Sequence, residues 1–130
     1  MGAQLRHQPT SSPHGFAATF LRAEGIFGPR VTIFDAAWSY RFIGGGPLGD
    51  ASGAGYFELG PAFAFVSGAP PAPDHRVLGA RASVSFDGYL GPVLLGVTLG
   101  YHGGVPLGGP RDAWEGAATS LLRLGLAFDL

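Results

Sequence analysis

The sequence predicts an all-β fold in which antiparallel strands run up and down as a meander and close into a barrel. Three observations support this. Gly and Pro are frequent, at 23 and 11 of 130 residues. Clusters of these two residues divide the chain into apolar stretches. Within the stretches, apolar residues alternate with small or polar ones at a period close to two, which is the period of a strand. About six strands are visible, and a small barrel of this type is expected to have eight or more, in an even number.

Each element follows from this pattern. Residues 1–15 are polar and are predicted to be a disordered tail, and residues 16–130 are predicted to form one barrel domain. The six expected strands lie approximately at Phe16–Phe27, Arg30–Ile43, Tyr56–Val66, Val77–Gly88, Val93–His102 and Ala113–Leu130. Two segments also allow a helix, because Ser12-Pro13 can cap a helix over Phe16–Gly25 and Asp112 with Glu115 imitates a capping box.

The two faces of these strands differ in an unusual way. One face carries large apolar residues, and the other carries Gly, Ala and Ser with few charges, whereas a solvated face is normally rich in charge. A barrel that spans a membrane accounts for both faces, since its outside is apolar with aromatic girdles and its lumen is polar. The predicted girdle consists of Trp38, Tyr40, Phe42, Tyr56, Phe57, Phe86, Tyr89, Tyr101 and Trp114. The predicted lumen-facing polar residues are Arg22, Glu24, Asp35, Arg41, Glu58, Arg81, Asp87, His102, Glu115, Arg123 and Asp129. Opposite charges in so narrow a lumen are expected to pair, because isolated buried charges are costly.

The last nine residues carry a resemblance to a known family. In Leu122–Leu130 the apolar residues alternate and end the chain, which resembles the terminal strand of Gram-negative outer-membrane β-barrel proteins. The predicted assembly signal is Leu122, Leu124, Leu126, Phe128 and Leu130. That family usually ends on an aromatic residue, whereas this chain ends on Leu130 with its aromatic at Phe128.

The resemblance implies a small barrel similar to the OmpA, OmpX or OmpW type in the bacterial outer membrane. Its implied partners are the lipid bilayer and the outer-membrane assembly machinery. Because only six strands are visible and no apolar signal segment occurs, the chain is predicted to be an N-terminally truncated or mis-started member.

Several kinds of chemistry find no support. The chain has no Cys, which excludes disulfides, thiolate metal sites and a Cys nucleophile, and its net charge of −1 predicts no nucleic-acid partner. Gly44–Gly49 matches G-x-G-x-x-G, but no helix pattern follows it, so no nucleotide site is predicted. His7, His14, His75 and His102 lack metal-ligand spacing, and Ser83 and Ser85 lack a recognisable triad. We therefore predict no enzyme, no cofactor and no metal.

Two functions remain. The first is an outer-membrane barrel that acts as a structural or surface scaffold, or as a narrow passive pore with an ion-paired lumen. The alternative is a soluble lipocalin-like β-barrel that turns its apolar face inward and binds a small apolar ligand.

Overall fold

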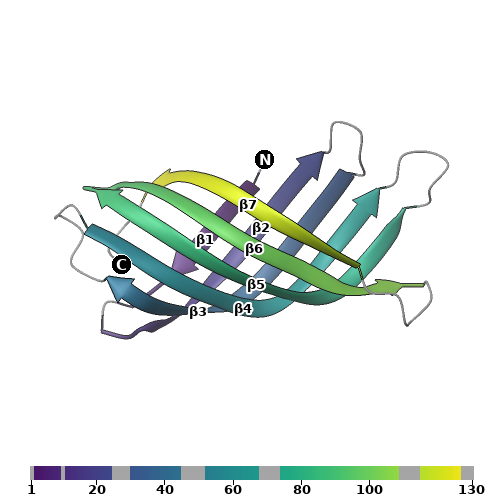
Figure 1. The fold of residues 1–130 in the computed structure, drawn as a ribbon, viewed down its shortest axis with the longest axis horizontal. Helices are drawn as coiled ribbons and strands as arrows, with labels where there is room; N and C mark the ends of the chain where they lie inside the picture. Colours follow the sequence, from purple (N-terminus) through teal and green to yellow (C-terminus); the bar gives the residue numbers. More distant parts are fainter. Residues whose placement is uncertain are drawn as a thin grey trace.

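The described residues form a single curled sheet of seven antiparallel strands (Figure 1). The computed structural model describes residues 2–9, 11–24, 30–44, 52–67, 74–108 and 115–126. The strands are β1 (Gly2–His7), β2 (His14–Glu24), β3 (Arg30–Gly44), β4 (Ser52–Ser67), β5 (His75–Leu90), β6 (Val93–Leu107) and β7 (Glu115–Leu126). Each strand pairs with its neighbour in sequence, in the order β1 to β7. The all-β meander predicted from the sequence is confirmed, and the sheet forms an open half-barrel.

The structure differs from the expected elements in three places. The segment expected to be a disordered tail contains β1, which pairs along its whole length with β2 from Gly2↔Leu21 to His7↔Phe16. Both segments that allowed a helix are strands, namely β2 and β7. The strand expected to end at His102 is longer, because β6 continues as far as Leu107. The described strands therefore number seven and not six.

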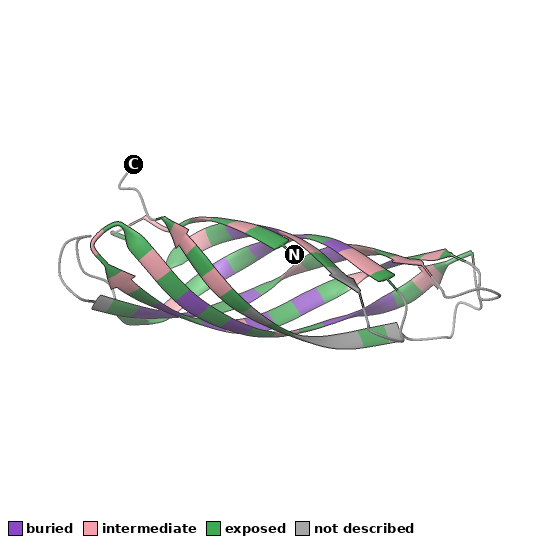
Figure 2. Cartoon of the chain, turned by 90° about the horizontal axis from the view of Figure 1, so that it is seen from above, coloured by how far each residue is buried: buried purple, intermediate pink, exposed green. Residues whose placement is uncertain are grey.

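Burial alternates along the strands, as Figure 2 shows by colour. In β5, Arg81, Ser83, Ser85 and Asp87 are buried on the concave side. Their neighbours Leu78 and Phe86 are exposed on the convex side. Because successive strand residues point to opposite faces, the sheet has a polar interior and an apolar outer surface. This agrees with the face assignment predicted for the segments around β3, β5 and β6.

Two local features shape the sheet. Pro61 in β4 has no backbone N–H, and the β3–β4 ladder has a gap between Asp35↔Ala62 and Trp38↔Leu59 without a change of register, whereas the register shifts between Arg41 and Ile43. A Cβ atom on the preceding Gly60 would overlap the backbone of Ala36, so the two strands approach closely there only because Gly60 lacks a side chain. At the other end of β5, Gly91 has a φ of 59° in the turn before β6, which is the positive φ that two-residue hairpins require.

Candidate functional site: a buried ionic network

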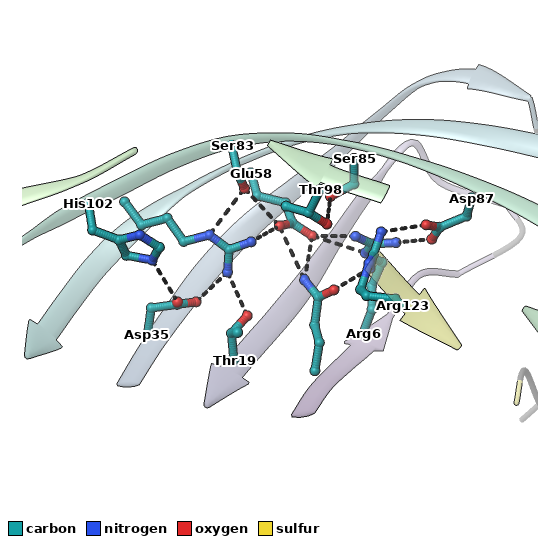
Figure 3. A network of polar contacts seen from close by, with 12 residues as sticks. Arg6, Thr19, Asp35, Glu58, Ser83, Ser85, Asp87, Thr98, His102 and Arg123 are labelled. Atoms are coloured by element: carbon teal, nitrogen blue, oxygen red, sulfur yellow. Dashed lines mark hydrogen bonds and ion pairs between the residues drawn. The ribbon is translucent and has the colours of Figure 1, made fainter. Parts of the chain in front are cut away.

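Three arginines and three carboxylates meet inside the curled sheet, as Figure 3 shows. We call these six residues the interior network: Arg6, Asp35, Glu58, Arg81, Asp87 and Arg123. They come from β1, β3, β4, β5 and β7, so five of the seven strands are tied together through their side chains.

Glu58 is the centre of the network and its side chain is fully buried. Its Oε1 accepts hydrogen bonds from Arg6 Nη2 at 2.5 Å and from Arg6 Nε at 3.1 Å. Its Oε2 accepts from Arg81 Nη2 at 2.6 Å and from Ser83 Oγ at 3.0 Å. Gln4 Nε2 also donates to the carboxylate, at 3.1 and 3.2 Å. Four side chains thus satisfy one carboxylate, which is what a buried charge requires.

Arg81 extends the network toward the end of the sheet where His102 lies. Its Nη1 donates to Asp35 Oδ1 at 2.6 Å and to Thr19 Oγ1 at 2.5 Å, and its Nε donates to Ser83 Oγ at 3.1 Å. The other oxygen of Asp35 lies 3.3 Å from His102 Nε2. Every nitrogen of the Arg81 guanidinium therefore has a partner, and the planar fork of arginine makes this geometry available.

Asp87 joins the two edge strands of the sheet from its position on β5. Its Oδ2 accepts from Arg6 Nη1 of β1 at 2.5 Å, and its Oδ1 pairs with Arg123 Nη2 of β7. Arg123 also donates to the side-chain oxygen of Gln4. Gly96 of β6 lies between Asp87 and Arg123 in the register, and a Cβ there would meet both side chains. The absence of a side chain at Gly96 leaves the space in which this ion pair forms.

The network balances its charges. Three guanidinium groups face three carboxylates, each arginine contacts at least one carboxylate, and each carboxylate contacts at least one arginine. Removing one member would leave its partner charged and buried, which is much more costly than burying a matched pair. The arrangement holds strands together, and its carboxylates are engaged by arginine.

A second polar cluster lies beside the network. The Tyr56 and Tyr89 hydroxyls are 3.1 Å apart, and the Arg6 guanidinium stacks 3.9 Å from the centre of the Tyr56 ring. Ser85 and Thr98 share a hydrogen bond of 2.9 Å across β5 and β6. Aromatic rings and hydroxyl groups thus fill the interior next to the charged residues.

The sequence predicted much of this network and missed part of it. Six of the predicted lumen residues lie in the interior and contact one another: Asp35, Glu58, Arg81, Asp87, His102 and Arg123. Arg41 lies nearer the end of β3, where its Nη2 donates to the Ser12 carbonyl at 3.3 Å. The prediction for Arg22 is wrong, because this residue is exposed. Arg22 lies two residues after the outward-facing Phe20 on β2, so both side chains are on the same face. The side chains of Glu24 and Glu115, and the whole of Asp129, lie outside the described residues.

Sequence reasoning missed Arg6, Gln4 and Thr19. The first two lie on β1, which was expected to be a tail. One signal could have found them, since Ala3 and Leu5 alternate with Gln4 and Arg6 just as apolar and polar residues do in the other strands.

The predicted aromatic girdle divides between the two faces. Six members are exposed on the outer face, namely Trp38, Tyr40, Phe42, Phe57, Phe86 and Tyr101. The prediction is wrong for Tyr56, which is only 4 % exposed, and for Tyr89, whose hydroxyl meets that of Tyr56 in the interior. Trp114 lies outside the described residues. On the outer face, His14 stacks on Trp38 with ring centres 5.6 Å apart and adjoins Tyr40 at 5.4 Å.

The predicted terminal-strand residues are placed in part. Leu122, Leu124 and Leu126 all point outward and are strongly exposed, and Arg123 between them points inward. Phe128 and Leu130 lie outside the described residues.

The remaining motifs of the sequence do not form a site in the described part of the chain. Gly44 ends β3 with a φ of 79°, and residues 45–49 of the G-x-G-x-x-G match are outside the described residues. Among the residues that the structure describes, no group of three or more His, Asp or Glu side chains could hold a metal ion. The described ranges also contain no helix with the length and apolar character needed to cross a membrane.

Comparison with known proteins identifies no relative. No protein-family model matches the chain, and neither the curated proteins nor the solved structures contain a match.

Proposed function

We propose that this chain is a membrane-embedded β-sheet protein of the outer-membrane type, with a structural role as a surface scaffold. One observation carries the proposal, which is that the usual distribution of residues is inverted. Large apolar side chains such as Trp38, Leu99 and Leu124 are exposed on the outer face, while the charged side chains of Glu58 and Arg81 are buried.

The outer face is difficult to reconcile with water. Monomeric soluble proteins rarely expose contiguous apolar patches larger than a few hundred Å². Here the exposed large apolar residues occur on all seven strands, so the apolar surface follows the whole convex side. A lipid environment removes the free-energy cost of exposing that apolar surface to water. Aromatic residues such as Trp38 and Tyr40 are suited to the lipid–water interface.

The interior favours a scaffold over a passive pore. Side chains from β1, β3, β4, β5 and β7 meet across the concave side and contact one another. The interior of a small barrel is filled by side chains, and here the filling consists of paired charges. The soluble lipocalin-like alternative requires the large apolar side chains to line the interior, whereas the described interior is lined by charged and hydroxyl groups together with mainly small apolar residues such as Ala17 and Ala37.

Refolding the purified chain with and without detergent micelles tests the proposal. We expect β-structure by far-UV circular dichroism, and a difference in gel mobility between unheated and boiled samples, only when micelles are present. Cooperative β-structure in plain buffer would contradict a lipid-facing surface. Conductance in planar bilayers separates the scaffold from the pore, because a scaffold filled by side chains gives no steady channel current. The proposed assembly signal consists of Leu122, Leu124, Leu126, Phe128 and Leu130. Deleting Phe128–Leu130 removes its last two members, and normal membrane insertion of the shortened chain would contradict this signal.

A further inference from the structure

The described sheet ends in two edge strands, β1 and β7, whose side chains meet although no backbone ladder joins them. Among the described residues, β1 pairs with β2 and β7 pairs with β6. Arg123 of β7 donates a hydrogen bond to Gln4 of β1. However, β1 and β7 are not among the strands whose Cα atoms approach within 8 Å at several positions. We call the space between these two edges the seam.

The direction of the edge strands shows what fits the seam. Each strand of a meander reverses the previous one, so β1 and β7 of a seven-stranded sheet run in the same direction. Direct closure would require a parallel ladder, which is slightly less stable per residue than an antiparallel one. One strand running the opposite way would be antiparallel to both edges. It would separate them by two strand spacings, or about 10 Å, which agrees with the lack of a β1–β7 ladder among the described residues.

The interior network limits the width of the seam. Asp87 holds Arg6 of β1 at 2.5 Å and also pairs with Arg123 of β7. Both edges are therefore tethered to the same carboxylate on β5, and the sheet cannot uncurl without breaking an ion pair. The seam has room for a single strand and not for a second sheet.

The chemistry of the seam specifies the strand that would occupy it. Outside, Leu5, Leu122 and Leu124 border the seam and are 76 %, 77 % and 80 % exposed. Inside, Arg123 Nε is buried and has no hydrogen-bond partner in the structure. A matching strand therefore alternates apolar residues outward with small residues inward, and carries one inward oxygen that accepts from Arg123.

We propose that the seam binds one β-strand donated by another polypeptide, antiparallel to both β1 and β7. Such strand addition uses main-chain hydrogen bonds for affinity and alternate side chains for specificity. The inference rests on the proposed membrane location, because each backbone group left unpaired in lipid costs several kcal/mol.

Disulfide cross-linking tests whether the seam closes on itself. The chain has no Cys, so Leu5→Cys can be combined with Leu122→Cys or Leu124→Cys. The matched control is Leu5→Cys with Ala18→Cys, because Leu5 and Ala18 are directly opposite in the β1–β2 ladder. A disulfide requires Cα atoms within about 7 Å, so we expect at least about tenfold less intramolecular disulfide across the seam than in the control. Cross-linking as efficient as in the control would overturn the proposal, and so would covalent dimers, which would assign the seam to a second copy.

A synthetic peptide then tests occupancy. The probe has the sequence of residues 14–24, HGFAATFLRAE, whose segment Phe16–Phe20 alternates in the required way and carries the Thr19 hydroxyl on its inward face. The control contains the same residues with both phenylalanines moved to the opposite face. We expect one fluorescent probe to bind per refolded chain, at least about tenfold more tightly than the control, because a one-residue slip turns every side chain to the other face. Equal binding of both peptides, or no binding, would overturn the proposal.

The two proposals fail in different ways. A heat-dependent gel mobility that requires micelles tests the proposed membrane location. Formation of the Leu5–Ala18 control disulfide shows separately that β1 is paired with β2. If the chain folds only in buffer, the membrane proposal fails. The same cross-linking and peptide measurements in buffer then still decide the seam.

Discussion

Replacing Glu58 by alanine tests the interior network at its centre. Glu58 is fully buried and accepts hydrogen bonds from Arg6, Arg81, Gln4 and Ser83. Its removal leaves two guanidinium groups with one carboxylate each, since Arg6 keeps Asp87 and Arg81 keeps Asp35. The network then holds three arginines against two carboxylates.

The expected decrease in the free energy of unfolding depends on how many hydrogen bonds Glu58 makes and on which partners the arginines keep without it. Hydrogen bonds to charged groups contribute about 1.5–3 kcal/mol each, but the arginines retain other partners, so these values do not add. Breaking a buried ion pair by removing one partner costs about 3–5 kcal/mol. We expect Glu58→Ala to lower the free energy of unfolding by that amount. Glu58→Gln keeps the size and one acceptor oxygen, and we expect a smaller loss of about 1.5–3 kcal/mol.

Urea unfolding of the micelle-refolded protein, followed by tryptophan fluorescence, measures both variants against the unmodified chain. The order of stability is the critical result: the unmodified chain first, then Glu58→Gln, then Glu58→Ala. If Glu58→Ala unfolds within about 0.5 kcal/mol of the unmodified chain, as surface substitutions do, then Glu58 is hydrated and the interior network does not hold the sheet together.

Three further substitutions probe the outer face, the space inside the sheet and the strand contacts. Leu124→Arg places a charge on the exposed face of β7 and is expected to cost about 2–4 kcal/mol in lipid near the bilayer midplane. Leu124→Ala is the control, and equal stability of the two variants in micelles would show that this face is not in contact with lipid. Gly96→Val inserts a side chain where Asp87 and Arg123 meet, and a loss of about 1–3 kcal/mol should be visible as a lower urea midpoint. Gly60→Val brings a Cβ against the Ala36 backbone. It should reduce the heat-resistant fraction on gels more than Pro61→Ala does, and the opposite order would contradict the close β3–β4 approach.

The fold class and the inward carboxylates could be predicted from the sequence, because alternate residues of one strand always point to the same face. This property depends only on the local sequence. In β5, Arg81 and Asp87 are six residues apart and so share a face whatever the rest of the chain does. The same rule exposes the errors. Tyr56 and Glu58 have the same parity, as do Tyr89 and Asp87, so these tyrosines could not lie outside while the carboxylates lay inside. Arg22 shares parity with Phe20 and follows it to the outer face.

The partners within the network could not be predicted from the sequence. Arg6 reaches β4 and β5 because the sheet curls and because β1 pairs with β2 in one register. Both are properties of the whole sheet and not of the segment that contains Arg6. The polar composition of Gly2–His7 also hides its strand character, since its side chains Gln4 and Arg6 are stabilised by residues more than fifty positions away.

The span of the network along the chain has a consequence for folding order. Every backbone ladder joins consecutive strands, so hairpins can form as soon as both strands exist, with short loops to close. The contact between Gln4 and Arg123, in contrast, joins residues 119 positions apart. Asp87 has both of its arginine partners only when β1 and β7 are both in place, so a sheet that lacks either edge strand carries an unbalanced carboxylate. The charges therefore balance only in the complete sheet, which couples the formation of its first and last strands.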